Sequence, residues 1–95
     1  LNQDDLLRRN IIQDLMCRFA LDYRIYESVF GIPFDRYFKD ELADLEQLAS
    51  LGLVRLKPHG LTVTPKGRFL IRNIAMVFDY HLRHRETKAQ YSQTV

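Results

Sequence analysis

The segment that decides the fold runs from Gly52 to Asp79 and reads GLVRLKPHGLTVTPKGRFLIRNIAMVFD. Leu53 to Lys57 alternates apolar and polar residues, as does Leu61 to Thr64, and the turn-forming Pro58-His59-Gly60 lies between them. Two alternating runs around a glycine-containing turn predict a β-hairpin. Because an isolated hairpin is only marginally stable in water, we expect it to pack against helices.

The hairpin leads directly into the last predicted helix. Thr64 is a favoured N-cap, and Pro65 occupies the first helical position, where proline is well tolerated. The apolar stripe that follows carries this helix to about Leu82; its members are Leu70, Ile74, Val77 and Phe78. Residues 83–95 contain few apolar side chains, and we expect them to form a polar, basic tail.

Two helices are predicted in the first third of the chain. An apolar side chain at every fourth position indicates an amphipathic helix from about Asp4 to Ala20; the stripe consists of Leu7, Ile11, Leu15 and Phe19. Asp22 is a suitable N-cap for a second helix that runs to Phe30. Gly31 is expected to end that helix in the left-handed conformation.

A third apolar stripe predicts a helix from Phe34 to Leu51, with a potential break near Asp40. The order helix, helix, helix, strand, strand, helix is that of a winged helix-turn-helix. We therefore expect residues 1–82 to form one winged-helix-like domain, mainly α, with three N-terminal helices, a two-stranded wing and a long C-terminal helix. This scaffold serves both DNA binding and plain packing, so the fold alone does not give the function.

Composition narrows the class of protein. A chain of 95 residues, 46% of them apolar, suits one compact domain. No run approaches the length of a membrane span, so no membrane partner is expected. The chain begins with Leu1 rather than Met, which suggests a fragment of a longer protein. Its single cysteine, Cys17, cannot form an internal disulfide; this favours a reducing cytosol, with Cys17 as a small buried apolar residue.

Charge is distributed unevenly. Residues 1–50 carry six Lys and Arg against ten Asp and Glu, a net −4, whereas residues 51–95 carry eight against two, a net +6. The predicted third helix, which would be the DNA-recognition helix, has a net charge of −3 and should be repelled by a duplex. No nucleic-acid partner is therefore expected. A DNA-binding transcriptional regulator remains the alternative, because the hairpin pattern is generic and cations surround it: Lys57, His59, Lys66 and Arg68.

The residues give little support to catalysis or metal binding within this chain. His81 and His84 have helical i, i+3 spacing, but no carboxylate or cysteine at helical spacing completes a ligand set. The serines lack a recognisable His and carboxylate pattern. An iron–sulfur cluster is held by several cysteine thiolates, and the chain has one cysteine. We therefore assign no catalytic, cofactor-binding or metal-binding residue here.

The stretch from Arg68 to Met76, RFLIRNIAM, resembles the C-terminal domain of oxygen-independent coproporphyrinogen III oxidases, the radical-SAM family called HemN. The IRNIAMVFD segment and the closing YSQTV are specific to these oxidases, whereas GLV and TPKGR are common in winged helices. The resemblance covers nearly the whole chain; its other blocks are Arg9 to Cys17, Phe30 to Ile32, Phe34 to Phe38, Gly52 to Val54, Thr62 to Arg68 and Tyr91 to Val95.

The resemblance implies a parent enzyme of bacterial, cytoplasmic haem biosynthesis. Such an enzyme converts coproporphyrinogen III to protoporphyrinogen IX without oxygen, using S-adenosylmethionine and a four-iron cluster held by a barrel domain of the same polypeptide. This chain would be an accessory domain that covers the barrel mouth or docks on it structurally. Arg68, Arg72 and Asn73 are the candidate contacts to substrate carboxylates or to the barrel. The plainer alternative is that both arginines are solvated or pair with the acidic third helix.

Docking without any ligand contact would instead use aromatic side chains. The candidates from the sequence are Tyr23, Tyr26, Tyr80 and Tyr91, although aromatic rings in so small a chain more often belong to its own core.

Overall fold

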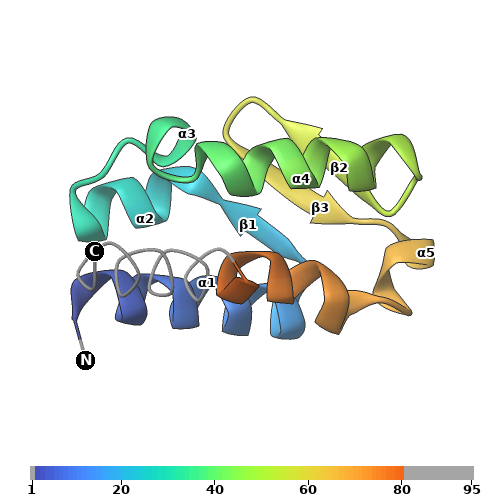
Figure 1. Cartoon of the computed structure of the whole chain (residues 1–95), viewed down its shortest axis with the longest axis horizontal. Helices are drawn as coiled ribbons and strands as arrows, with labels where there is room; N and C mark the ends of the chain where they lie inside the picture. The colour runs from blue at the N-terminus through green and yellow to red at the C-terminus, as the bar shows by residue number, and fades with distance from the viewer. Residues whose placement is uncertain (1, 81–95) are drawn as a thin grey trace, which may run out of the picture.

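The computed structural model describes residues 2–80, in which short helices and one small antiparallel sheet surround a single core (Figure 1). The helices are α1 (Gln3–Arg18), α2 (Tyr23–Phe30), α3 (Phe34–Tyr37), α4 (Lys39–Ser50) and α5 (Pro65–Arg68), and residues 71–80 are also helical. The strands are β1 (Ala20–Asp22), β2 (Val54–Lys57) and β3 (Gly60–Val63), in the sheet order β1-β3-β2. The mainly helical prediction with a small β element is confirmed.

The predicted hairpin is present as β2 and β3, joined through Pro58 and His59. The third strand, β1, was not predicted from the sequence. It pairs with β3 through Leu21 opposite Leu61, and it is too short to show a strand periodicity. Phe19 ends α1 in the left-handed conformation, at φ 56°, which turns the chain into β1. The first helix therefore stops at Arg18 rather than at Ala20.

The predicted caps of the second helix are confirmed. The Asp22 carboxylate accepts a hydrogen bond from the Arg24 N–H, and Gly31 ends α2 with φ 67°. The third helix is interrupted at Phe38, close to the expected break near Asp40. Phe38 is fully buried and leaves helical geometry, at φ −107° and ψ 37°, as its ring packs between Phe34 and Phe78.

The last helix is divided, contrary to the prediction of one continuous helix. Thr64 caps α5 as expected, but α5 is a single turn that ends at Arg68, and a turn at residues 69 and 70 precedes the helix over 71–80. A β-carbon on Gly67 would lie 1.9 Å from the carbonyl oxygen of Leu53. Glycine therefore allows α5 to sit directly on the chain that follows α4. Several predictions fall outside the described residues. These are the helix end at Leu82, the boundary between residues 82 and 83, the polar tail, and the positions of His81, His84 and Tyr91.

The core is apolar and rich in aromatic rings. Rings of Tyr23 and Phe34 stack with centroids 4.1 Å apart, and Phe38 meets Phe78 edge-on at 5.3 Å. One face of the sheet directs Leu21 and Leu61 into this core. The helix over 71–80 closes it with buried side chains; these are Ile74, Ala75 and Phe78.

The single cysteine is not part of the core. Cys17 is exposed on α1, so its interpretation as a buried apolar residue was wrong. It lies outside the repeat of Leu7, Ile11 and Leu15 that faces the core. Among residues 2–80, no helix is long and apolar enough to cross a membrane.

Candidate functional site

The three residues singled out in the sequence lie at the C-terminal end of the described chain. Arg68 is the last residue of α5, and its guanidinium stacks over the Phe19 ring at 4.6 Å from the centroid. Arg72 and Asn73 are exposed on the helix over 71–80. Both lie on the exposed side of that helix, about 100° apart around its axis. The structure thus groups Arg72 with Asn73 and holds Arg68 against the end of α1.

The plainer alternative was that both arginines are solvated or pair with the acidic third helix, and no such pairing is found among residues 2–80. Within residues 2–80, no salt bridge involves Arg68 or Arg72. One acidic residue of that helix, Glu41, is instead fully buried and bonded to Arg8, with 2.6 Å between Nη1 and Oε2. Arg72 therefore presents its charge to solvent in this structure.

Apolar side chains share the exposed face of Arg72 and Asn73. Met76 and Tyr80 lie one and two turns further along the same face, with exposed fractions of 47% and 52%. Phe69, in the preceding turn, is 90% exposed. Sequence reasoning noted Tyr80 but missed Phe69 and Met76. The signal was present, because positions 69, 72, 73, 76 and 80 repeat at helical spacing beside the apolar stripe that was recognised.

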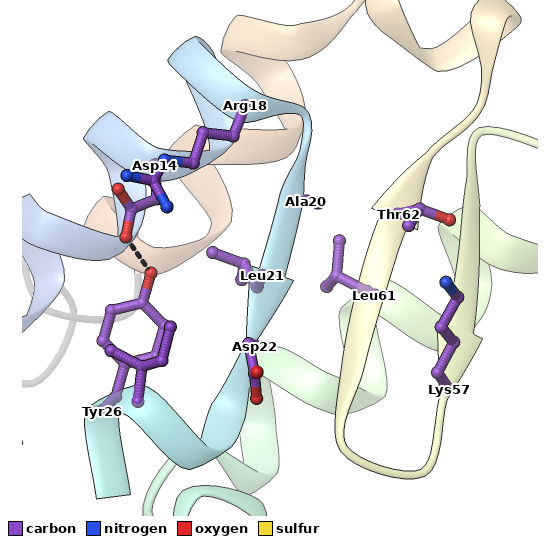
Figure 2. Close-up of a pocket in the computed structure, with 10 residues that line it drawn as sticks. Asp14, Arg18, Ala20, Leu21, Asp22, Tyr26, Lys57, Leu61 and Thr62 are labelled. Atoms are coloured by element: carbon purple, nitrogen blue, oxygen red, sulfur yellow. Dashed lines mark hydrogen bonds between the residues drawn. The ribbon is translucent and has the colours of Figure 1, made fainter. Parts of the chain in front are cut away.

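A separate small cleft of about 220 Å³ lies where α1, α2 and the sheet meet (Figure 2). Figure 2 shows the Tyr26 hydroxyl donating a hydrogen bond to the Asp14 carboxylate across this cleft. Burial, followed by the Asp14 hydrogen bond, raises the pKa of Tyr26, so this phenol stays protonated at neutral pH. Arg18 and Lys57 line the same cleft.

The polar groups of this cleft are arranged as a structural contact. Both of its acidic residues have partners, since Asp14 accepts from Tyr26 and Asp22 accepts from Arg24. The Arg24 hydrogen bonds also lower the pKa of Asp22. Among residues 2–80, no group of three or more His, Cys, Asp and Glu side chains is placed to hold a metal ion. The Tyr26–Asp14 hydrogen bond across the cleft joins α1 to α2.

The element order and the sheet place the chain among small, mainly helical domains that carry one three-stranded antiparallel sheet. Comparison with known proteins identifies it. The HemN C-terminal domain family matches residues 1–70, and the chain belongs to that family. The fold agrees, because a solved structure entitled "Coproporphyrinogen III oxidase (HemN) from Escherichia coli is a Radical SAM enzyme" superposes with a TM-score of 0.82 and 46% identity over 85% of this chain.

Named relatives extend the similarity beyond the family match. Over its full length the chain is 43% identical to an oxygen-independent coproporphyrinogen III oxidase of Salmonella typhimurium, of which it covers 21%. It is 51% identical to the enzyme of that name from Thermostichus vulcanus over 86% of this chain and 25% of the relative. The chain therefore spans about a fifth to a quarter of the length of these relatives, and about 19% of the Escherichia coli structure.

Proposed function

We propose that this chain is the C-terminal accessory domain of a cytosolic oxygen-independent coproporphyrinogen III oxidase. The observation that carries the proposal is the 43% identity, over all 95 residues, with an enzyme of that name. The parent would oxidatively decarboxylate coproporphyrinogen III to protoporphyrinogen IX in haem biosynthesis. A CxxxCxxC motif in the sequence that precedes this domain in its gene supports the proposal, and a gene without one contradicts it.

The cofactors of such a parent do not fit this chain. A four-iron cluster is held by cysteine thiolates, and the chain contains one cysteine, the exposed Cys17. The cluster and the S-adenosylmethionine bound to it would therefore belong to the barrel domain of the same polypeptide. None of the chemical steps of the reaction is assigned to residues of this chain.

The contribution we propose for this domain is to help enclose the substrate at the barrel mouth. Coproporphyrinogen III carries four carboxylates, and arginine pairs bidentately with carboxylates. Arg72 is exposed, has no salt bridge within residues 2–80 and lies beside the amide of Asn73. Arg68 is held in place by the Phe19 ring. These three residues are therefore our candidates for contacts to substrate carboxylates or to the barrel rim.

Steady-state kinetics of the full-length oxidase test the role of Arg72. Losing a charge-assisted hydrogen bond to substrate should cost about 1.5–3 kcal/mol, which corresponds to roughly a 10–150-fold fall in kcat/KM for Arg72→Ala. Arg55→Ala is the matched control, because Arg55 is an exposed arginine on β2. Unchanged kcat/KM in Arg72→Ala would remove Arg72 from the substrate site. Parallel loss in both variants would indicate a general charge effect.

The DNA-binding alternative receives no support from the comparisons, which assign the chain to the oxidase family. The phosphates of a DNA duplex would also repel the exposed acidic residues of α3 and α4, which include Asp35, Asp40 and Glu46. The winged-helix description is retained as a proposal, motivated by the hairpin that follows the helices. Tight, salt-sensitive binding of the chain to duplex DNA in a gel-shift experiment would revive the alternative.

A further inference from the structure

The least expected surface of this chain surrounds Phe69. Its side chain is 90% exposed, and exposed apolar neighbours accompany it; these are Leu70 (43%), Met76 (47%) and Tyr80 (52%). A single exposed apolar residue is ordinary in a folded protein, whereas a group of them on one surface marks an interaction site. We call Phe69, Met76 and Tyr80, together with Arg72 and Asn73, the Phe69 face, because these positions repeat at helical spacing.

The backbone that presents Phe69 is fixed on both sides. Before it, the Thr64 side chain accepts a hydrogen bond from the Gly67 N–H, and Arg68 stacks on Phe19. After it, the Leu70 N–H donates to the Gly67 carbonyl, and the Leu70 carbonyl accepts from Ile74. A backbone held in this way loses little conformational entropy on binding. Phe69 is therefore an exposed aromatic residue on a fixed backbone, as suits an anchor at an interface.

We infer that the Phe69 face docks on the rest of the parent polypeptide, with Phe69 inserted in an apolar pocket of the barrel domain. The inference rests on the proposed function in one respect: it requires a larger parent. The chain accounts for only 21% of the length of the full-length relatives, so a large surface from the same polypeptide is available to cover this face. Arg72 and Arg68 supply a positive rim, and we expect acidic groups opposite them.

This arrangement refines the proposal for Arg72. Since Arg72 and Asn73 lie on the same helical face as Met76 and Tyr80, docking that buries Met76 brings Arg72 to the boundary between the two domains. There it would be desolvated on one side, which strengthens its attraction to a carboxylate from either the barrel or the substrate. The apolar side chains of the Phe69 face would thus hold the two domains together, and Arg72 would fix how one domain is oriented on the other.

Hydroxyl-radical footprinting, which is independent of turnover, tests the inference even if the assigned reaction is wrong. The labelling rates of Phe69, Met76 and Tyr80 are compared between the 95-residue chain and the full-length protein. We expect a fall of about tenfold or more in the full-length protein. Val29 is the internal reference, because it is 70% exposed on α2, which lies at the opposite end of the molecule from α5 (Figure 1).

Three outcomes would overturn the inference. Equal labelling of Phe69 in the two proteins means that the barrel does not cover it. Protection already present in the 95-residue chain, and lost when residues 81–95 are deleted, means that the C-terminal segment covers the face. Protection that increases with the concentration of the 95-residue chain, together with dimers in sedimentation, means that a second copy covers it.

A pair of variants checks the energetic part of the inference in the full-length protein. Phe69→Ser should increase the rate of protease cleavage between the domains about tenfold or more, since an aromatic anchor is lost. Val29→Ser, at an exposed apolar residue on α2, should leave that rate unchanged. In the 95-residue chain, the thermal unfolding midpoints of the two variants should lie within a few degrees of that of the unsubstituted chain. Equal cleavage rates for both full-length variants would contradict the role of Phe69.

Discussion

Replacing Arg8 with methionine tests the main buried polar contact of the domain. Arg8 is 1% exposed, and its Nη1 lies 2.6 Å both from Glu41 Oε2 on α4 and from the Phe78 carbonyl oxygen of the helix over 71–80. Its Nε also donates to Asp4 at 3.0 Å, and its guanidinium lies 5.1 Å from the centre of the Phe38 ring. One side chain therefore connects α1, α4 and the C-terminal helix.

The expected loss of stability for Arg8→Met follows from burial. Methionine fills most of the volume, but Glu41, which is 0% exposed, loses its buried cationic partner. Removing one member of a buried ion pair costs about 3–5 kcal/mol. Arg9→Met is the matched control on the next residue, where Arg9 is 65% exposed and 3.8 Å from Asp5; there we expect about 0–1 kcal/mol.

Urea unfolding followed by circular dichroism measures both variants. Because so large a loss can abolish folding, the double variant Arg8→Met with Glu41→Leu completes the experiment. Replacing a buried pair by apolar residues is often neutral or stabilising, so the double variant should recover most of the loss. Equal effects of Arg8→Met and Arg9→Met would refute the reasoning, as would a double variant no more stable than Arg8→Met.

Three further predictions concern the turn into α5 and a buried tyrosine. Gly67→Ala should lower the stability of the chain by roughly 1–3 kcal/mol in thermal unfolding, because its β-carbon would meet the Leu53 carbonyl oxygen at 1.9 Å. A variant as stable as the unsubstituted chain would contradict this. Thr64→Val should cost about 1 kcal/mol, since it removes the cap to the Gly67 N–H, whereas Thr64→Ser should retain most of that stability. Burial raises the pKa of Tyr23 to about 12, whereas in the unfolded chain the phenol has its ordinary pKa of about 10. As the pH rises from 10 to 12, the unfolded chain therefore loses this proton before the folded chain does. The free energy of unfolding should fall by up to about 2–3 kcal/mol over that range. Tyr23→Phe, which preserves the stacking on Phe34, should lessen that loss; an identical alkaline profile would show that Tyr23 is not its source.

Much of the local structure was predictable because its signals are local. Thr64 and Asp22 cap helices through hydrogen bonds to residues two or three positions away, and Gly31 takes the left-handed conformation that glycine favours. The hairpin followed from alternation around a turn. The family assignment likewise depended on contiguous motifs, and the family match confirmed it. The assignments of Arg68, Arg72 and Asn73 to a site remain predictions.

The features that sequence reasoning missed depend on contacts between distant segments. β1 exists because Leu21 pairs with Leu61, and the third helix breaks where Phe38 enters a cluster with Phe34 and Phe78. Nothing near Arg8 in the sequence indicates that it is buried, since its partners Glu41 and Phe78 lie 33 and 70 residues away.

The sequence by itself determined the type, the caps and the approximate bounds of most elements, and the family. Tertiary structure decided which side chains are buried and which remain exposed. It buried Arg8 and Glu41 as a pair and left Phe69 and Cys17 exposed. The physical reason is that capping and periodicity act within a few residues of the chain. Burial depends on how whole helices and strands pack together. A docking surface can be recognised only once that packing shows which apolar side chains remain exposed.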